Sequence, residues 1–121
     1  MIDVRDSGDF AATVLRAPAQ HKGCTYTLTG SASLSLRDAA AELGEVYGTP
    51  IAYQPVTPDD AQRSMVDAGL SAWMAAVNKE YLTAYSEGWG DYTTPDFEKV
   101  MGRPARSFAD FARAHAPQIR P

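Results

Sequence analysis

The sequence predicts a helix-rich α/β fold, with a small parallel sheet of about two to three strands and about five to six helices. Three observations predict it. Short β-branched or aromatic runs alternate with runs of helical period in the first half of the chain, helix start and stop signals follow one another in the second half, and alanine is abundant. The length of 121 residues, 45% of them apolar, fits one domain over residues 1–121.

Three short segments have the pattern of strands. Residues 1–4 open with apolar side chains, residues 25–29 alternate threonine with tyrosine and leucine, and residues 51–56 are bounded by prolines. A predicted helix separates each segment from the next. Such alternation favours parallel pairing through right-handed crossovers, so the sequence predicts a parallel sheet.

The helices are predicted from their ends. After capping residues at 6–9, a first helix runs to the residue before Pro18, and residues 18–23 are typical of a turn. Ser35 and Asp38 form a capping-box pattern before a second helix, which ends at Gly48. The remaining signals predict helices over residues 57–69, 71–88 and 94–102 and from residue 107 onward.

The charge pattern excludes several classes of partner. Residues 1–90 carry 6 basic and 11 acidic side chains and residues 91–121 carry 5 basic and 4 acidic ones, so clustered positive charge for a nucleic acid is missing. No apolar run approaches the ~20 residues of a membrane span, and acidic residues interrupt the start, where a secretory signal would be apolar. The single cysteine, Cys24, is typical of a reducing setting, so the sequence predicts a cytoplasmic protein.

The sequence lacks the motifs of common catalytic sites. It has no glycine-rich phosphate loop, no Gly-x-Ser-x-Gly elbow and no Tyr-x-x-x-Lys pair. His21 and Cys24 are three residues apart, but two ligands fall short of a metal site and a turn explains them. Ser35 or Ser107 could be combined with His115 and an aspartate into a catalytic triad, but both serines already have a role as helix caps. We therefore assign no catalytic residue, no metal and no cofactor site to the chain.

Aromatic side chains recur at helical spacing on the longest predicted helix. Trp73, Val77, Tyr81 and Tyr85 are four residues apart, and Trp89 continues the series. Such a stripe is usually the core face of its helix. The alternative is a pocket for a flat or apolar ligand, because ligand pockets are mostly aromatic with a few polar tips. These five residues are the candidate substrate-binding residues.

Four stretches of the sequence together resemble a known family. They are residues 25–35 (TYTLTGSASLS) with the alanine-rich helix behind them, residues 1–6 (MIDVRD), residues 48–53 (GTPIAY), and residues 102–108 (GRPARSF) followed by Phe111 and His115. In order and spacing they resemble the C-terminal portion of NmrA-like proteins. These are atypical short-chain dehydrogenase/reductase relatives that bind NAD(P)(H) and include NAD(P)H:quinone oxidoreductases. The resemblance spans essentially the whole chain, and Ser7-Gly8 departs from the apolar pair expected there.

The resemblance implies that the chain is the substrate-binding C-terminal portion of an NmrA-like NAD(P)H-dependent oxidoreductase. The family's N-terminal Rossmann half, which holds NADPH or NADH, has no counterpart in the sequence, so the chain alone is expected to bind no cofactor. The long aromatic helix matches one that borders the substrate pocket in the family. This match favours Trp73, Tyr81 and Tyr85 as residues that contact the ligand.

Two alternatives stay open, and with them the question of whether the chain is an enzyme. The chain could be a stand-alone protein, with Met1 as its natural start, that kept only the ligand-side fold: a small-molecule-binding module, a cofactor-free isomerase or cyclase, or an accessory subunit. It could also be a purely structural or interaction domain. A small sheet without the Rossmann half leaves one apolar face bare, which predicts a homodimer or a larger homo-oligomer.

Overall fold

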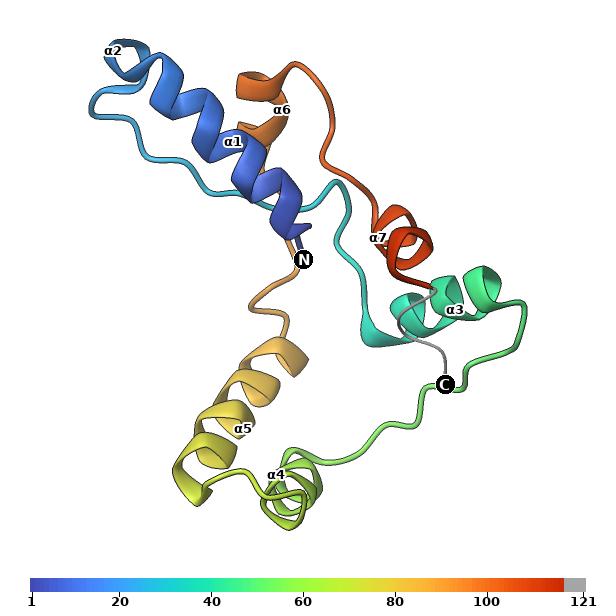
Figure 1. The fold of residues 1–121 in the computed structure, drawn as a ribbon. Helices are drawn as coiled ribbons and strands as arrows, with labels where there is room; N and C mark the ends of the chain where they lie inside the picture. Colours follow the sequence, from blue (N-terminus) through green and yellow to red (C-terminus); the bar gives the residue numbers. More distant parts are fainter. Residues whose placement is uncertain (117–121) are drawn as a thin grey trace. The chain divides into compact units, whose positions relative to one another are not determined.

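The computed structural model is helical (Figure 1). It describes residues 1–116, and no helix in that range has the length and apolar character of a membrane span. The helices of the described range are α1 (Val4–Arg16), α2 (Pro18–His21), α3 (Leu36–Tyr47), α4 (Pro58–Asp67), α5 (Ala72–Ser86), α6 (Asp96–Met101) and α7 (Phe108–His115).

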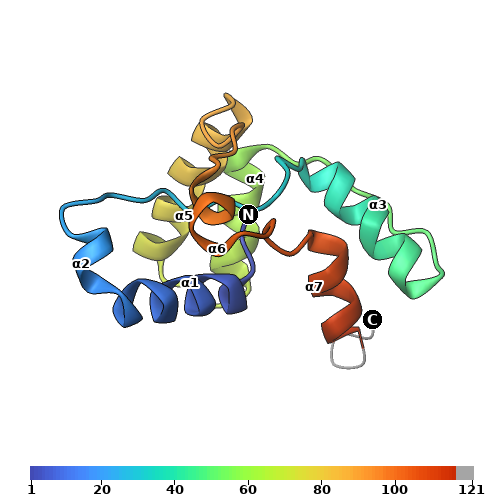
Figure 2. The ribbon, with the colours of Figure 1, turned by 90° about the horizontal axis from the view of Figure 1, so that it is seen from above.

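The chain divides into two compact units. Unit 1 consists of Met1–Ala52 and Tyr92–Pro121, and unit 2 of Tyr53–Asp91. In unit 1, α1 packs against α2 and α6, and α3 packs against α7 (Figures 1 and 2). Unit 2 is the pair α4 and α5. The expectation of one domain over residues 1–121 stays a prediction.

The core of unit 1 joins segments from the two ends of the chain. Phe10 on α1 stacks on Phe97 of α6 with ring centroids 6.2 Å apart, and the ring of Tyr26 meets Phe10 edge-on at 5.2 Å. Ala105 completes the buried cluster. Partly buried side chains surround it: Ile2, Val14, Leu28, Val100 and Met101. Burial of this apolar surface is the main favourable term for the unit.

The serine and threonine caps predicted for four of the helices are confirmed, two in each unit. Ser35 and Ser107 each form a complete capping box, with Asp38 and Asp110 at the third helical position. Gly48 ends α3 with a φ of 67°, in the left-handed region that glycine adopts without strain. In unit 2 the side chains of Thr57 and Ser71 cap α4 and α5, as their sequence positions predicted.

The predicted sheet is wrong: residues 1–116 contain no strand. Residues 25–29 have no ladder partner, and the backbone groups of Thr27 pair instead with Thr94, just before α6, and with Asp96, the first residue of α6. The Thr27 N–H donates to Asp96 Oδ2 at 2.9 Å, and the Thr94 hydroxyl donates to the Thr27 carbonyl. Alternating β-branched residues favour an extended backbone, but a strand also needs a second backbone opposite it. Residues 51–56 are likewise not a strand.

The end of the first predicted strand and most of the predicted turn are helical instead. Residue 4 already belongs to α1, because the Asp3 side chain accepts a hydrogen bond from the Arg5 N–H and caps the helix ahead of the capping residues predicted at 6–9. Pro18 occupies the first position of the short helix α2, where proline is favoured, so part of the predicted turn is helical.

Candidate functional site

The aromatic stripe of α5 lies on the surface. α5 packs on α4 through the face that holds Ala75, which is fully buried, and Lys79, whose Nζ lies 2.6 Å from Asp59 Oδ1 on α4. The predicted ligand-contacting aromatic residues are largely exposed, at 70% for Trp73, 55% for Tyr81, 56% for Tyr85 and 63% for Trp89, and Val77 is partly buried. The stripe is therefore not a buried core face, and its role in substrate binding stays a prediction.

Two members of the stripe lie in contact. The rings of Tyr85 and Trp89 meet edge-on with centroids 5.5 Å apart. The turn after α5 brings them together, and Gly90 lies so close to the Tyr85 ring that a Cβ there would be 2.4 Å from Cε1. Trp73 lies near the other end of α5, roughly 18 Å away along the helix axis by the rise per residue.

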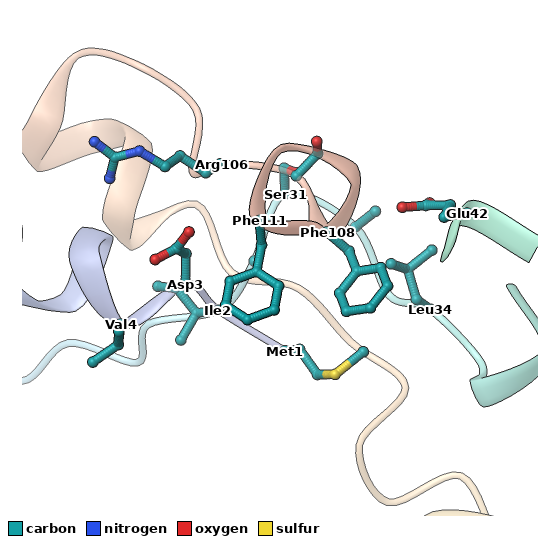
Figure 3. A pocket seen from close by; sticks show the side chains of 13 residues that line it. Met1, Ile2, Asp3, Val4, Ser31, Leu34, Glu42, Arg106, Phe108 and Phe111 are labelled. Carbon is teal, nitrogen blue, oxygen red and sulfur yellow. The ribbon is translucent and has the colours of Figure 1, made fainter. Parts of the chain in front are cut away.

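Unit 1 contains a pocket of about 480 Å³ (Figure 3). Four parts of the chain line it: residues 1–4, residues within 30–34, Glu42 on α3, and residues at 106–111. Gly30 lets the chain pass close to the N-terminal segment, since a Cβ at this position would lie 2.0 Å from the Met1 carbonyl oxygen. The rings of Phe108 and Phe111, stacked with centroids 6.1 Å apart, give the pocket an aromatic wall.

A buried carboxylate holds one side of this pocket in place. Asp6 is fully buried and accepts a hydrogen bond from the backbone N–H of Arg106 at 2.6 Å. The guanidinium groups of Arg103 and Arg106 also donate to Asp6, and both contact Asp9. We call these four residues the arginine clasp. It joins α1 to the segment before α7, and its hydrogen-bonded residues are 94 to 100 positions apart in the sequence.

Asp3 lies beside the clasp and lines the pocket. Its side chain is almost completely buried and forms a two-point ion pair with Arg5, with Nη2 to Oδ2 at 2.5 Å and Nε to Oδ1 at 3.0 Å. These hydrogen bonds from Arg5 lower the pKa of the Asp3 carboxyl to about 2, because they favour the charged form. Asp3 is therefore an ionised helix cap under ordinary conditions.

Glu42 is the lining carboxylate that lacks a complete set of partners. Its Oε2 atom is buried and has no hydrogen-bond partner. In Figure 3, Glu42 and Leu34 lie on one side of the two phenylalanine rings, and Arg106 and Asp3 lie on the other. A buried acceptor without a donor is uncommon and costs free energy.

The other sequence candidates have structural roles. Nδ1 of His21 lies 2.7 Å from the Tyr26 hydroxyl, whose pKa is raised by its hydrogen bond with Cys24. His115 stacks on Phe111 and places Nδ1 2.8 Å from the Phe111 carbonyl oxygen. Among the residues that the structure describes, no group of three or more histidine, cysteine or acidic side chains could hold a metal ion.

Sequence reasoning missed the pocket and the clasp. Both depend on residues that are far apart in the chain, and no local pattern pairs them. The available signal for the clasp was charge spacing: Asp6 and Asp9 are three apart near the start, and Arg103 and Arg106 are three apart near the end. The resembling stretches at residues 1–6 and 102–108 contain three of the four clasp residues, Asp6, Arg103 and Arg106, so the two ends of the resemblance were the useful clue.

The chain is similar to parts of several known oxidoreductases. It is 40% identical over 119 residues to an NAD(P)H azoreductase of Xenophilus azovorans, an alignment that covers 95% of this chain and 40% of the relative. An NADPH-dependent quinone oxidoreductase of Escherichia coli has the same fold over 97% of this chain and 42% of its own, with a TM-score of 0.83 and 25% identity. Triphenylmethane reductase of Citrobacter sp. matches with a TM-score of 0.76 and 25% identity over 91% of this chain and 37% of its own. No protein-family model matches the chain.

These comparisons define the class of protein. The chain is homologous to a part of NAD(P)H-dependent oxidoreductases, and it spans about two fifths of the length of the relatives it matches. The resemblance to NmrA-like proteins, stated above from four stretches of sequence, is thereby confirmed.

Proposed function

We propose that the chain is the substrate-side portion of an NAD(P)H-dependent oxidoreductase, and that the exposed face of α5 contacts a flat, conjugated acceptor. The observation that carries this proposal is the exposure of Trp73, Tyr81, Tyr85 and Trp89 on a helix that packs on α4 with its other face. Exposed aromatic side chains in one stripe are unusual for a surface that only meets water. The names of the three relatives, an azoreductase, a quinone oxidoreductase and a reductase of triphenylmethane dyes, support a conjugated aromatic acceptor.

Within the proposal, this chain does not itself hold the nicotinamide cofactor. Dinucleotides are held by a glycine-rich turn between a strand and a helix, and neither that motif nor, in residues 1–116, a strand is present. Within the proposal, the cofactor is held by the part of the relatives that this chain does not match. The chain's own contribution is to bind and orient the acceptor.

A fluorescence titration tests the proposed contact surface. Both tryptophans of the chain belong to the stripe, so a naphthoquinone such as menadione bound there should quench their emission in a saturable way. Tyr81→Ala should weaken this binding several-fold, because the menadione ring can no longer stack on the tyrosine ring. Tyr53→Ala, which removes an exposed tyrosine of unit 2 outside α5, is the matched control and should leave binding unchanged. Linear quenching without saturation, or equal binding by both variants, would overturn the proposal.

The intact mass of the protein, as its source cell makes it, tests whether acceptor binding by this chain depends on a separate cofactor-holding portion. A species much heavier than 13.1 kDa that oxidises NADPH when the quinone is added is the expected result. A species of 13.1 kDa that is alone sufficient for its cellular role would contradict the proposed reliance on a separate cofactor-holding portion, and would favour a stand-alone binding module.

A further inference from the structure

The pocket of unit 1 is not used by the proposed function. Its volume of about 480 Å³ lies in the range of ~300–1,000 Å³ that small-molecule pockets occupy. Phe108 and Phe111 form one wall, and Ile2 and Leu34 add aliphatic surface beside them (Figure 3). A pocket with these walls suits a ring of six to ten atoms, because an aromatic ring buries its faces against phenylalanine at little conformational cost.

The charged side chains that line the pocket differ in whether their polar atoms already have hydrogen-bond or ion-pair partners. The Asp3 carboxylate is engaged by Arg5 at both oxygens, and the Arg106 guanidinium is engaged by Asp6 and Asp9. Glu42 alone of these lining charges has a buried oxygen without a partner in the described structure. The group that would complement it is a hydrogen-bond donor, and a positively charged donor would complement it best.

We propose that this pocket binds a small aromatic molecule that carries a protonated amine or amidine. The ring lies against Phe108 and Phe111, and the charged nitrogen donates to the Glu42 carboxylate. The nitrogen then lies on the side of the rings opposite Arg106, so it is kept apart from that guanidinium group (Figure 3). This binding needs no cofactor and no residue of α5.

Calorimetric titration of the 121-residue chain with benzamidine tests the proposal. Benzyl alcohol and benzoate are the matched ligands, with the same ring but no charge or the opposite charge. Saturable binding of benzamidine, at least about tenfold tighter than that of benzoate, is expected, since a hydrogen bond to a charged group is worth roughly one to two powers of ten in affinity. Equal binding of the three ligands, or no binding of benzamidine, would overturn the proposal.

Two variants locate the site. Glu42→Gln should weaken benzamidine binding about tenfold, whereas Glu45→Gln, on an exposed position of the same helix, should leave it unchanged. Ala32→Phe places a large side chain at an exposed position of the pocket wall and should abolish binding while the helical circular dichroism stays as in the wild type. Binding that survives both Glu42→Gln and Ala32→Phe would place benzamidine elsewhere and contradict the proposal.

Tryptophan emission separates this proposal from the proposed function. Both tryptophans lie in unit 2, so benzamidine bound in unit 1 should shift the NMR signals of Phe108 and Phe111 without quenching tryptophan. Menadione bound at α5 should do the reverse. Quenching of tryptophan by benzamidine, with unchanged phenylalanine signals, would overturn the pocket assignment and leave the α5 surface unaffected.

Discussion

Unit 1 and unit 2 use their aromatic side chains in opposite ways. In unit 1, Phe10 and Phe97 are buried against each other although they come from distant parts of the chain. In unit 2, Trp73 and Tyr81 are exposed, and the buried residue of the α4–α5 pair is Ala75. The spacing of aromatic residues on a helix therefore does not decide their burial; the packing partner does. Phe10 and Phe97 stabilise the fold of unit 1, whereas Trp73 and Tyr81 of unit 2 remain available for contacts.

Removing one aromatic side chain from each unit gives the largest expected contrast. Phe97→Ala should lower the free energy of unfolding by about 3–5 kcal/mol, because it deletes a side chain that is 2% exposed and leaves a cavity. Trp73→Ala should change it by at most about 0.5 kcal/mol, because the side chain is 70% exposed. Urea denaturation followed by circular dichroism measures both. Similar losses for the two variants would break the comparison between the units.

The arginine clasp is the next strongest difference between the units. Asp6→Ala should lower the free energy of unfolding by about 3 kcal/mol, because it leaves two guanidinium groups and the Arg106 N–H without their buried acceptor. Asp67→Ala, at an exposed position at the end of α4, is the control in unit 2 and should cost almost nothing. If Asp6→Ala prevents folding, Asp6→Asn keeps one acceptor and should show a smaller loss. A loss below about 1 kcal/mol for Asp6→Ala would show that the clasp contributes little.

The sequence was sufficient for features that lie within a few residues of each other. The caps at Ser35, Thr57, Ser71 and Ser107 are confirmed because a side-chain oxygen and the backbone it accepts from are at most three positions apart. The sheet is wrong because a strand needs a partner far along the chain. Within residues 25–29, the backbone of Thr27 and the hydroxyl of Thr29 form hydrogen bonds with Thr94 and Asp96, a pairing that no local pattern contains.

The same limit applies to the candidate sites. The aromatic stripe on α5 was visible from its four-residue spacing, but its exposure depends on which face of α5 meets α4. The pocket of unit 1 was not visible, because its lining brings Ile2, Glu42 and Phe111 together from three separated segments. Periodicity predicts which residues share a face of a helix, and tertiary packing decides what that face contacts.

Acid should weaken unit 1 through Asp3. Its pKa is about 2 in the folded chain and 3.8 in its ordinary state, so the folded form binds its proton less readily than the unfolded form. The stability that the ionised carboxylate contributes is therefore fully present above pH ~5 and is lost as the pH falls toward 2, by about 1–2 kcal/mol. Asp3→Asn keeps a capping oxygen but cannot titrate. The difference in unfolding free energy between wild type and Asp3→Asn should shrink between pH 5 and pH 2; a constant difference would contradict the role of the Arg5 ion pair.

The smallest expected effect is the stability lost when a helix-capping serine is replaced, and it should be equal in the two units. Ser107 accepts a hydrogen bond from the Asp110 N–H at 3.1 Å in unit 1, and Ser71 accepts one from the Met74 N–H at 3.2 Å in unit 2. Ser107→Ala and Ser71→Ala should each cost about 1 kcal/mol by chemical denaturation, because each leaves a helix N-terminal N–H without its acceptor. Threonine at either position keeps an acceptor oxygen and should restore most of the loss. Equal losses would mean that the units differ in long-range packing and not in local helix energetics, whereas a loss confined to Ser107 would show that the capping box in unit 1 is strengthened by its surroundings.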